Sequence, residues 1–309
     1  MKPEDMIKTI ERVLGKEQIL TQEPMSKHTS FRVGGNAQIL LLPTIEQMPK
    51  LIRLLYQEEI PYLVKGNGSN LLVGDDGIDG VVIELGNQAA DIHCAAQDDT
   101  IILEAGAGCL LSKLANRALE ESAGGFEFAA GIPGTFGGAI VMNAGAYGGE
   151  IKDVLQHARV LTREGEVLEL GPKELDLSYR HSIVPERGYI VLGGTIALPR
   201  ADAKDIKARM DELKEQRTTK QPLEYPSAGS TFKRPEGYFA GKLIQDAGLK
   251  GFQVGGAQVS EKHSGFVINK GNATAKDIRD LMEEVQAKVE QQFGVHLEPE
   301  VKMVGKFRS

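Results

Sequence analysis

The chain of 309 residues contains no tryptophan and only two cysteines, Cys94 and Cys109. Two cysteines are too few for a disulfide framework, and neither belongs to a Cys-x-x-Cys pair, so a reducing compartment fits this composition best. No segment approaches the roughly 18 consecutive apolar residues of a membrane-spanning helix, and the first residues contain no apolar signal core. We therefore expect a cytoplasmic protein without membrane insertion.

Clusters of metal ligands and an excess of basic residues are also lacking. The six histidines, at positions 28, 93, 157, 181, 263 and 296, have no metal-ligand spacing, so the sequence predicts no metal site. The formal net charge of −7 disfavours binding to a nucleic-acid backbone. A local basic patch could still hold one anionic small molecule. Small molecules are therefore the expected partners, and the sequence leaves the oligomeric state open.

Glycine, in contrast, is abundant. The chain has 36 glycines among 309 residues, about one residue in nine, whereas the usual share is about 7%. The 41% hydrophobic and 26% charged fractions are those of a globular protein and exclude long disorder and a coiled coil. A chain of this length has room for two or three domains. The pattern of elements predicts three α+β stretches, at residues 1–88, 89–200 and 201–309.

Periodic apolar residues predict the main elements. Helices are expected at residues 45–59, 110–121 and 203–217 and near Leu243. Strands are expected at residues 38–42, 62–65, 81–85, 100–105, 154–162, 167–170 and 189–197, the last three antiparallel, and near Gln258 and Val267. A final helix is expected to begin after a capping box of Thr274 and Asp277 and to stop at Gly294.

The first glycine-rich segment, residues 65–72, reads Lys-Gly-Asn-Gly-Ser-Asn-Leu-Leu and follows a predicted strand. Its glycines leave backbone N–H groups free to approach an anion closely, as in phosphate cradles. It lacks the third glycine of the dinucleotide fingerprint and the Gly-Lys-Ser/Thr ending of a P-loop. A hairpin-like turn with Asn-Gly chemistry is the alternative interpretation.

The second glycine-rich segment, residues 131–149, contains seven glycines and few charges. Such a composition indicates backbone pressed against something flat or anionic, since flexible linkers are usually rich in serine. Glycine-mediated helix packing is the alternative. Two such loops on separate α+β units would suit a long dinucleotide whose pyrophosphate lies between them.

Taken together, six segments in order resemble the UDP-N-acetylenolpyruvoylglucosamine reductase family. They are Thr-Ser-Phe-Arg-Val-Gly-Gly at residues 29–35, the loop at 66–72, the segment at 131–148, Tyr-Arg at 179–180, Gly-Ser-Thr-Phe-Lys at 229–233 and Glu-Pro-Glu-Val at 298–301. The resemblance implies an α+β protein with a vanillyl-alcohol-oxidase-like, two-part FAD-binding fold and a C-terminal α+β substrate-binding domain. The last residues are expected to pack back on the first subdomain.

The same resemblance implies the reaction. NADPH, as co-substrate, reduces non-covalently bound FAD, and flavin N5 then delivers hydride to the enolpyruvyl double bond of UDP-N-acetylglucosamine enolpyruvate. The product is UDP-N-acetylmuramate, a precursor of peptidoglycan. Hydride addition places negative charge on the adjacent carbon and its carboxylate, so catalysis needs a nearby cation and a proton donor. By resemblance Arg180 stabilises the charge, Ser230 donates the proton, and Glu300 is the partner of Ser230.

The remaining site residues are also implied by the resemblance. Tyr179, Lys220 and Lys233 are expected to bind substrate, the two lysines near its phosphates. The expected FAD-binding residues are Arg32, Lys65, Gly66, Asn67, Gly68, Ser69, Asn70, Leu71, Gly131, Ile132, Pro133, Gly134, Thr135, Gly137, Gly138, Asn143 and Gly145.

Two departures from the family pattern limit this transfer. Arg234 stands where other members carry Asn, so an amide contact to substrate is not carried over. The chain also has no room after Arg180 for the long Tyr-bearing loop that some members fold over the uridine, so it resembles the shorter class. Phe232 and Tyr238 are candidates to close the site instead, although core packing is the favoured role for both.

Two other functions are compatible with the same fold. A flavin oxidase acting on another substrate would need oxygen for flavin reoxidation, whereas the reductase would be reoxidised by its enolpyruvyl substrate without oxygen. A non-catalytic FAD- or nucleotide-binding regulatory protein would show flavin absorbance without turnover. The presence of Arg180, Ser230 and Glu300 together favours the reductase.

Overall fold

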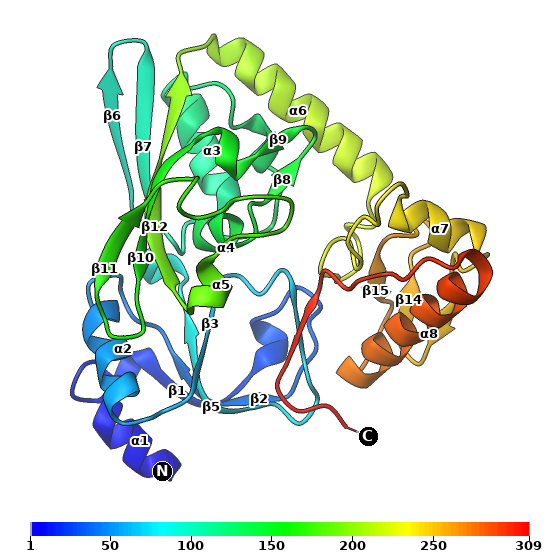
Figure 1. Cartoon of the computed structure of the whole chain (residues 1–309), viewed down its shortest axis with the longest axis horizontal. Coiled ribbons are helices and arrows are strands. Elements are labelled where there is room, and N and C mark those ends of the chain that lie inside the picture. Colours follow the sequence, from blue (N-terminus) through cyan, green and yellow to red (C-terminus); the bar gives the residue numbers. More distant parts are fainter. Residues whose placement is uncertain (1, 309) are drawn as a thin grey trace. The chain divides into compact units, whose positions relative to one another are not determined.

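The computed structural model describes residues 2–308, which form two compact units (Figure 1). The first unit comprises the N-terminal residues through Leu20, together with Ile39–Asn67 and Gly80–Gln216. The second comprises Thr21–Gln38, Gly68–Asp79 and the chain from Arg217 onward. Both units are therefore built from separate stretches of sequence. The three-domain division expected from the sequence stays a prediction.

The chain forms two larger sheets, of which the five-stranded one lies wholly within the first unit. A four-stranded sheet has the order β1 (Ile19–Pro24), β2 (Asn36–Leu41), β5 (Ile78–Glu84), β3 (Tyr62–Lys65), with β3 and β5 parallel. A five-stranded antiparallel sheet has the order β11 (Val167–Leu170), β10 (Leu155–Leu161), β12 (Ile190–Pro199), β7 (Thr100–Gly106), β6 (Ile92–Gln97). The antiparallel pairing predicted for the last three strands is confirmed.

Helices and one small hairpin complete the elements of this part of the chain. They are α1 (Pro3–Ile10), α2 (Met48–Gln57), α3 (Leu111–Glu120), α4 (Phe136–Val141), α5 (Val184–Arg187), α6 (Ala203–Lys220) and the hairpin of β8 (Gly145–Ala146) and β9 (Gly149–Glu150). Helix α4 packs against β12 and β7 (Figure 1). The second glycine-rich segment therefore contains a helix, packed on the middle of the five-stranded sheet. This helix is missing from the predicted elements and was anticipated only by the alternative of glycine-mediated helix packing.

The second unit contains a three-stranded antiparallel sheet of β13 (Gln253–Val254), β14 (Ala257–Val259) and β15 (Val267–Asn269). Helix α8 (Ala275–Phe293) packs against this sheet and against α7 (Ala240–Asp246). Two further strands, β4 (Leu71–Val73) and β16 (Lys302–Val304), pair in parallel. The last residues thus return to a strand that follows the first glycine-rich loop.

The predicted start and end of the final helix are confirmed. Thr274 Oγ1 accepts the Asp277 N–H at 3.0 Å, Asp277 Oδ2 accepts the Thr274 N–H at 3.0 Å, and Gly294 ends the helix with a φ of 67°. A further cap comes from far away in sequence. The Asp75 carboxylate accepts the N–H groups of Ala275 and Lys276 at 2.8 and 2.9 Å, where the helix dipole favours a negative charge.

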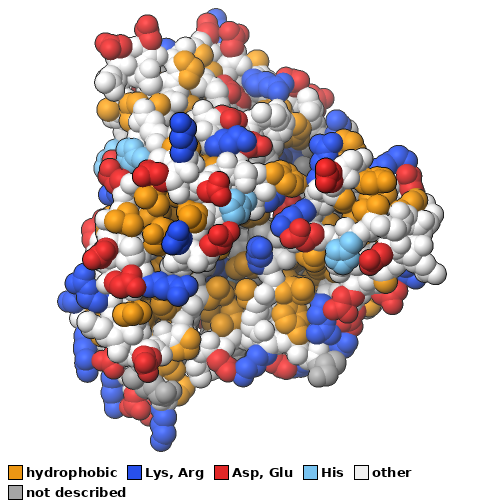
Figure 2. All heavy atoms as spheres, in the orientation of Figure 1, with side chains coloured by type: hydrophobic (Ala, Val, Ile, Leu, Met, Phe, Trp, Pro, Cys, Tyr) orange, Lys and Arg blue, Asp and Glu red, His pale blue; other side chains and the backbone are white. Residues whose placement is uncertain are grey.

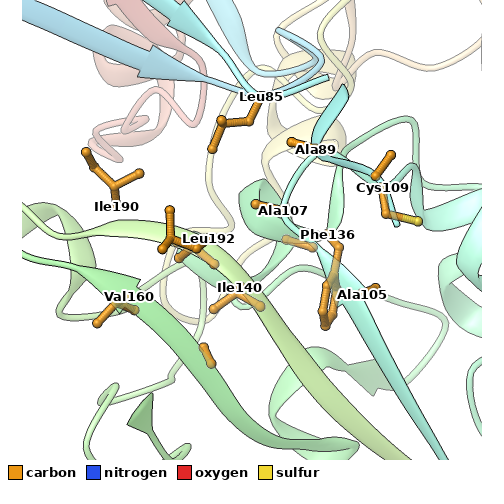
Figure 3. Close-up of a cluster of buried hydrophobic side chains, with 14 of the residues drawn as sticks. Leu85, Ala89, Ala105, Ala107, Cys109, Phe136, Ile140, Val160, Ile190 and Leu192 are labelled. Atoms are coloured by element: carbon orange, nitrogen blue, oxygen red, sulfur yellow. The ribbon is translucent and has the colours of Figure 1, made fainter. Parts of the chain in front are cut away.

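Each unit has its own apolar core. Figure 3 shows part of the core of the first unit, in which Phe136 of α4 lies among side chains of β7, β10 and β12. The side chain of Phe136 is fully buried, which stabilises the fold by roughly 1.5–3 kcal/mol. The helix expected at residues 45–59 from its periodic apolar residues is observed as α2, and its apolar residues Met48, Leu51, Ile52 and Leu55 are fully buried.

The surface carries no large region of one charge in the view of Figure 2, where acidic and basic side chains alternate over the visible face. Within residues 2–308, no helix is both long and apolar enough to cross a bilayer.

Candidate cofactor and substrate site

The first glycine-rich loop joins β3 to β4. The backbone N–H groups of Asn67, Gly68 and Ser69 in this loop donate to no acceptor among the described residues. Strand β3 pairs with β5 and β4 with β16, both in parallel, so the alternative interpretation of this loop as a hairpin turn is wrong. A loop with several unused N–H groups is the arrangement that binds a phosphate.

The two glycine-rich segments are in direct contact. The Asn67 side-chain amide donates to the Pro133 carbonyl oxygen at 2.6 Å. A Cβ atom placed on Gly66 would lie 2.1 Å from Thr135 Oγ1, so a larger residue at position 66 would push the loops apart. The sequence placed these loops on separate stretches, and the structure brings them together.

The second segment uses its glycines for two different purposes. Gly137 is buried, and a Cβ on it would lie 2.7 Å from the Ala107 Cβ, so this glycine permits α4 to pack closely on the sheet. Gly138 is exposed, and its nearest neighbour would be Thr135 Oγ1 at 3.5 Å. Helix packing therefore explains Gly137, while Gly138 offers an open backbone surface.

Lys65 does not direct its charge into the loop. Its side chain is 2% exposed and forms an ion pair with Glu84, its partner in the parallel register of β3 and β5. Burial lowers the pKa of Lys65, and the neighbouring Glu84 carboxylate opposes this shift. The ammonium group expected to meet a cofactor is thus engaged with a carboxylate of the same sheet.

Asn143 is almost completely buried, with 1% exposure, in a left-handed conformation with a φ of 42°. Its amide nitrogen donates to Glu150 Oε2 at 2.8 Å and to the Ser178 carbonyl at 3.1 Å, and its oxygen accepts the Lys152 N–H at 2.9 Å. The amide is therefore used within the chain. Gly145 lies in the β8–β9 hairpin, where a Cβ would be 2.6 Å from the Gly149 carbonyl.

Tyr179 and Arg180 are the two central residues of a tight turn. Ser178 and His181 exchange backbone hydrogen bonds of 3.2 and 3.1 Å across it. Arg180 has a φ of 55°, a conformation that non-glycine residues rarely adopt and that recurs at functional sites. Its guanidinium lies 5.3 Å from the centre of the Tyr179 ring, which is 51% exposed.

Ser230 and Glu300 belong to the second unit and lie on paired segments. The Glu300 N–H donates to the Thr231 carbonyl at 2.8 Å, and the Lys233 N–H donates to the Glu298 carbonyl at 2.8 Å. Thr231 is buried and accepts the Val267 N–H on its hydroxyl at 2.9 Å. The exposed Ser230 therefore precedes anchored backbone at Thr231 and follows Gly229, which has a left-handed conformation with a φ of 74°.

The first loop is also joined to the segment that contains Glu300. Asn70 Nδ2 donates to the Glu300 carbonyl at 3.0 Å, and the Lys302 N–H donates to the Asn70 carbonyl at 3.0 Å. Glu300 itself is 9% exposed. An expected cofactor-binding residue and an expected catalytic residue are thus joined by a hydrogen bond just before the paired strands β4 and β16.

The expected substrate-binding residues differ in their surroundings. Lys220 is exposed at the end of α6, whereas Lys233 forms an ion pair with Glu298. Arg234 stacks on Phe239, with 4.0 Å from its guanidinium carbon to the ring centre. Phe232 is 3% exposed and packs in the core, as its favoured role predicted, but Tyr238 is 47% exposed, so core packing is wrong for Tyr238.

One residue near the first loop was missed by the sequence reasoning. The Ser30 N–H donates to the Gly68 carbonyl at 3.2 Å, and the Ser30 hydroxyl is buried without a partner among the described residues. Its neighbour Arg32, an expected FAD-binding residue, is exposed and has a φ of 56°. The signal available in the sequence was the position of Ser30 inside the same seven-residue motif as Arg32.

The other expected FAD-binding residues lie in or beside the two glycine-rich loops. Leu71 begins β4, and Gly131, Ile132, Pro133 and Gly134 precede α4. Thr135 is the N-cap of α4, and its hydroxyl accepts the Gly138 N–H at 3.5 Å. Among residues 2–308, no group of three or more His, Cys, Asp or Glu residues is arranged to hold a metal ion.

Comparison with known families gives the chain a class. A model described as FAD binding domain matches residues 37–171, and a model described as UDP-N-acetylenolpyruvoylglucosamine reductase, C-terminal domain matches residues 221–304. A Phl p 4 variant described as a glucose oxidase shares the fold over 64% of this chain and 44% of its own, with a TM-score of 0.50 at 10% identity. The chain is a flavin-dependent oxidoreductase with a vanillyl-alcohol-oxidase-like fold.

Relatives over the full length define the family. A UDP-N-acetylenolpyruvoylglucosamine reductase from Agathobacter rectalis is 56% identical and covers 97% of this chain and 98% of its own. One from Lachnoclostridium phytofermentans is 50% identical, with 97% of each covered. The crystal structure of the Thermus caldophilus enzyme matches 92% of this chain and 97% of its own with a TM-score of 0.77 at 35% identity. The chain belongs to the UDP-N-acetylenolpyruvoylglucosamine reductase family.

Proposed function

We propose that this chain uses NADPH and non-covalently bound FAD to reduce the enolpyruvyl double bond of UDP-N-acetylglucosamine enolpyruvate, forming UDP-N-acetylmuramate for peptidoglycan synthesis. The observation that carries the proposal is the contact between the two glycine-rich loops at Asn67 and Pro133, in a chain of this family. The loops supply N–H donors to an anion, which a long dinucleotide such as FAD contains.

The described residues fit FAD. Three consecutive backbone N–H groups, from Asn67 to Ser69, have no acceptor among the described residues. Ser30, whose N–H donates to the Gly68 carbonyl, has a buried hydroxyl that also lacks a partner among the described residues. Gly138 exposes backbone on the neighbouring segment. Phosphate oxygens would satisfy these donors, and a flat ring system can approach backbone that carries no Cβ. When bound, FAD accepts a hydride from NADPH and supplies it to the substrate double bond.

Arg180 is proposed to stabilise the negative charge that develops on the substrate carboxylate. A guanidinium offers two parallel N–H donors that match a carboxylate, and it stays protonated throughout the working pH range. The turn holds this side chain beside Tyr179, which we propose as a substrate contact. Preorganised charge of this kind acts most strongly where water is excluded.

Ser230 is proposed to donate the proton to the carbon next to the carboxylate. A serine hydroxyl is a weak acid in water, so this role requires a fixed position beside the developing carbanion. The pairing of residues 231–233 with residues 298–300 supports such a position and keeps Glu300 near Ser230. We propose that Glu300 tunes the path of the proton, with Lys220 and Lys233 near the substrate phosphates.

The partners in this proposal are small molecules, NADPH and the UDP-sugar. Both carry phosphates, and the chain would meet them in the cytoplasm, where nucleotide-sugar precursors are made. The absence of a membrane-spanning helix within residues 2–308 is compatible with this location.

An anaerobic absorbance experiment tests the function. The purified protein is expected to show a flavin band at about 450 nm, typical of such cofactors, that bleaches with NADPH and returns on addition of UDP-N-acetylglucosamine enolpyruvate. Bleaching without return would keep the flavoprotein and reject the substrate. Return only after oxygen is admitted would instead support an oxidase, and a flavin that NADPH does not bleach would support a regulatory protein.

A further inference from the structure

The turn that carries Arg180 is hydrogen-bonded to the last residue of helix α4 and to Asn143, which follows the helix. Two hydrogen bonds bracket the turn. The Asn143 amide donates to the Ser178 carbonyl at 3.1 Å before the turn, and the Ser182 hydroxyl donates to the Val141 carbonyl at 2.6 Å after it. Asn143 and Ser182, which we call the clamp, are 1% and 3% exposed.

The conformation of the turn shows why a clamp is needed. Arg180 has a φ of 55°, which costs an L-residue free energy in comparison with ordinary backbone, so the turn would relax if it were not held. The hydrogen bonds between Ser178 and His181 close the turn but do not fix it to the rest of the unit. The bonds made by Asn143 and Ser182 are the ones that connect it to α4.

The Asn143 amide is itself held in one orientation. Its oxygen accepts the Lys152 N–H, and its nitrogen also donates to Glu150, so the amide cannot rotate without losing bonds. The hydrogen bond from Lys152 holds the pKa of Glu150 below its usual value despite partial burial, and Asn143 and the charge of Arg180 act in the same direction.

We infer that Asn143 and Ser182 are positioning residues for Arg180 in substrate reduction. This inference rests on the proposed role of Arg180, and it gives Asn143 a function different from the cofactor contact expected from the sequence. The clamp fixes the strained turn to α4, whose glycine-rich segment is proposed to bind FAD. These hydrogen bonds therefore fix the position of the Arg180 turn relative to the segment that is proposed to bind the cofactor.

The test compares the two half-reactions in the FAD-loaded protein with Asn143→Ala and Ser182→Ala. FAD affinity, measured by quenching of flavin fluorescence, and flavin reduction by NADPH are expected to stay within about threefold of the wild type. Flavin reoxidation by UDP-N-acetylglucosamine enolpyruvate is expected to slow by about 10- to 100-fold, since small misplacements of a catalytic group have effects of this size. Thr195→Val, which removes a buried hydroxyl bonded to His157 in the same unit, is the control and should change neither rate.

A second measurement separates positioning from general weakening of the fold. If the clamp acts through Arg180, Asn143→Ala should slow reoxidation by less than about threefold when introduced into an Arg180→Ala background. Equal slowing in both backgrounds, or equal loss in both half-reactions, would overturn the inference. Loss of FAD affinity with normal reoxidation at saturating FAD would make Asn143 a cofactor ligand instead. Should Asn143→Ala fail to fold, Ser182→Ala alone decides, since a normal reoxidation rate there refutes the clamp.

The wild-type control keeps the two proposals apart. If substrate does not reoxidise the wild-type flavin, the proposed function fails and the clamp with it. If the wild type turns over and the clamp variants match it, only the clamp is refuted.

Discussion

The side chain of Asn70 donates a hydrogen bond of 3.0 Å to the backbone carbonyl of Glu300, although the two residues are 230 positions apart. Asn70 ends the loop proposed to hold the FAD pyrophosphate, and Glu300 is the proposed partner of the proton donor. The bond, together with the parallel pairing of β4 and β16, fixes the end of the loop to the strand that positions Glu300. The proposed cofactor loop and the proposed partner of the proton donor are therefore held by one local structure.

Ser230→Ala is expected to affect one half-reaction. Flavin reduction by NADPH needs no proton from Ser230 and should remain nearly normal. Reoxidation by the enolpyruvyl substrate should slow by roughly 100- to 10,000-fold, the usual contribution of a general acid. Anaerobic stopped-flow absorbance measures both rates, and an equal loss in the two would refute the role.

Replacement of Arg180 by glycine should separate stability from activity. Glycine adopts a φ of 55° without strain, so the free energy of unfolding of Arg180→Gly should exceed that of Arg180→Ala by about 1 kcal/mol. Both variants lose the cation, and reoxidation by substrate should fall by roughly 100- to 1,000-fold in each. Urea unfolding and single-turnover kinetics measure the two effects. Normal reoxidation in either variant would contradict the proposed charge stabilisation.

Gly137 and Gly138 should respond oppositely to alanine. Gly137→Ala places a Cβ 2.7 Å from the Ala107 Cβ, and such overpacking should lower the free energy of unfolding by about 1–3 kcal/mol. Gly138→Ala meets only Thr135 Oγ1 at 3.5 Å and should leave folding intact, with a small gain in helix propensity. If Gly138 faces FAD, its variant should bind FAD at least about tenfold more weakly. Unchanged affinity would remove Gly138 from the proposed site.

Cys109 should make stability depend on pH in the alkaline range. Burial raises the pKa of its thiol from 9.0 to about 11. As pH rises above 9, the unfolded chain therefore loses its proton first, and the folded state loses up to roughly 3 kcal/mol by pH 11. Chemical unfolding at pH 8, 9.5 and 11 measures this loss, with Cys109→Ala as the control that lacks the thiol. A constant difference in unfolding free energy between the two proteins would contradict the prediction.

Local signals in the sequence predicted several elements well. The cap and stop of α8, the apolar stripe of α2 and the antiparallel strands before Pro199 depend on neighbouring residues, and all are observed. Helix α4 was missed because glycines at 137 and 138 disfavour a helix, and only the N-cap Thr135 and the packing of Phe136 on the sheet offset this.

Features that depend on distant pairing could not be predicted. The ion pair of Lys65 with Glu84 follows from the parallel register of β3 and β5, and no local pattern encodes that register. The same holds for the bonds of Asp75 at the start of α8 and of Asn143 at Ser178. The family resemblance supplied the expected functional residues, but their hydrogen-bond partners come only from the fold.

The second unit needs the last residues of the chain before it can be complete. Its strand β16 pairs with β4, and its core includes Phe31 and Leu72 from the first quarter of the sequence. On the ribosome this unit must therefore wait until residues 302–304 have been made, because Phe31 and Leu72 pack in a core that includes residues from the second half of the sequence. A fragment that begins at residue 221 would lack both of these residues. Synthesis through residue 304 is thus a condition for the complete folding of this unit.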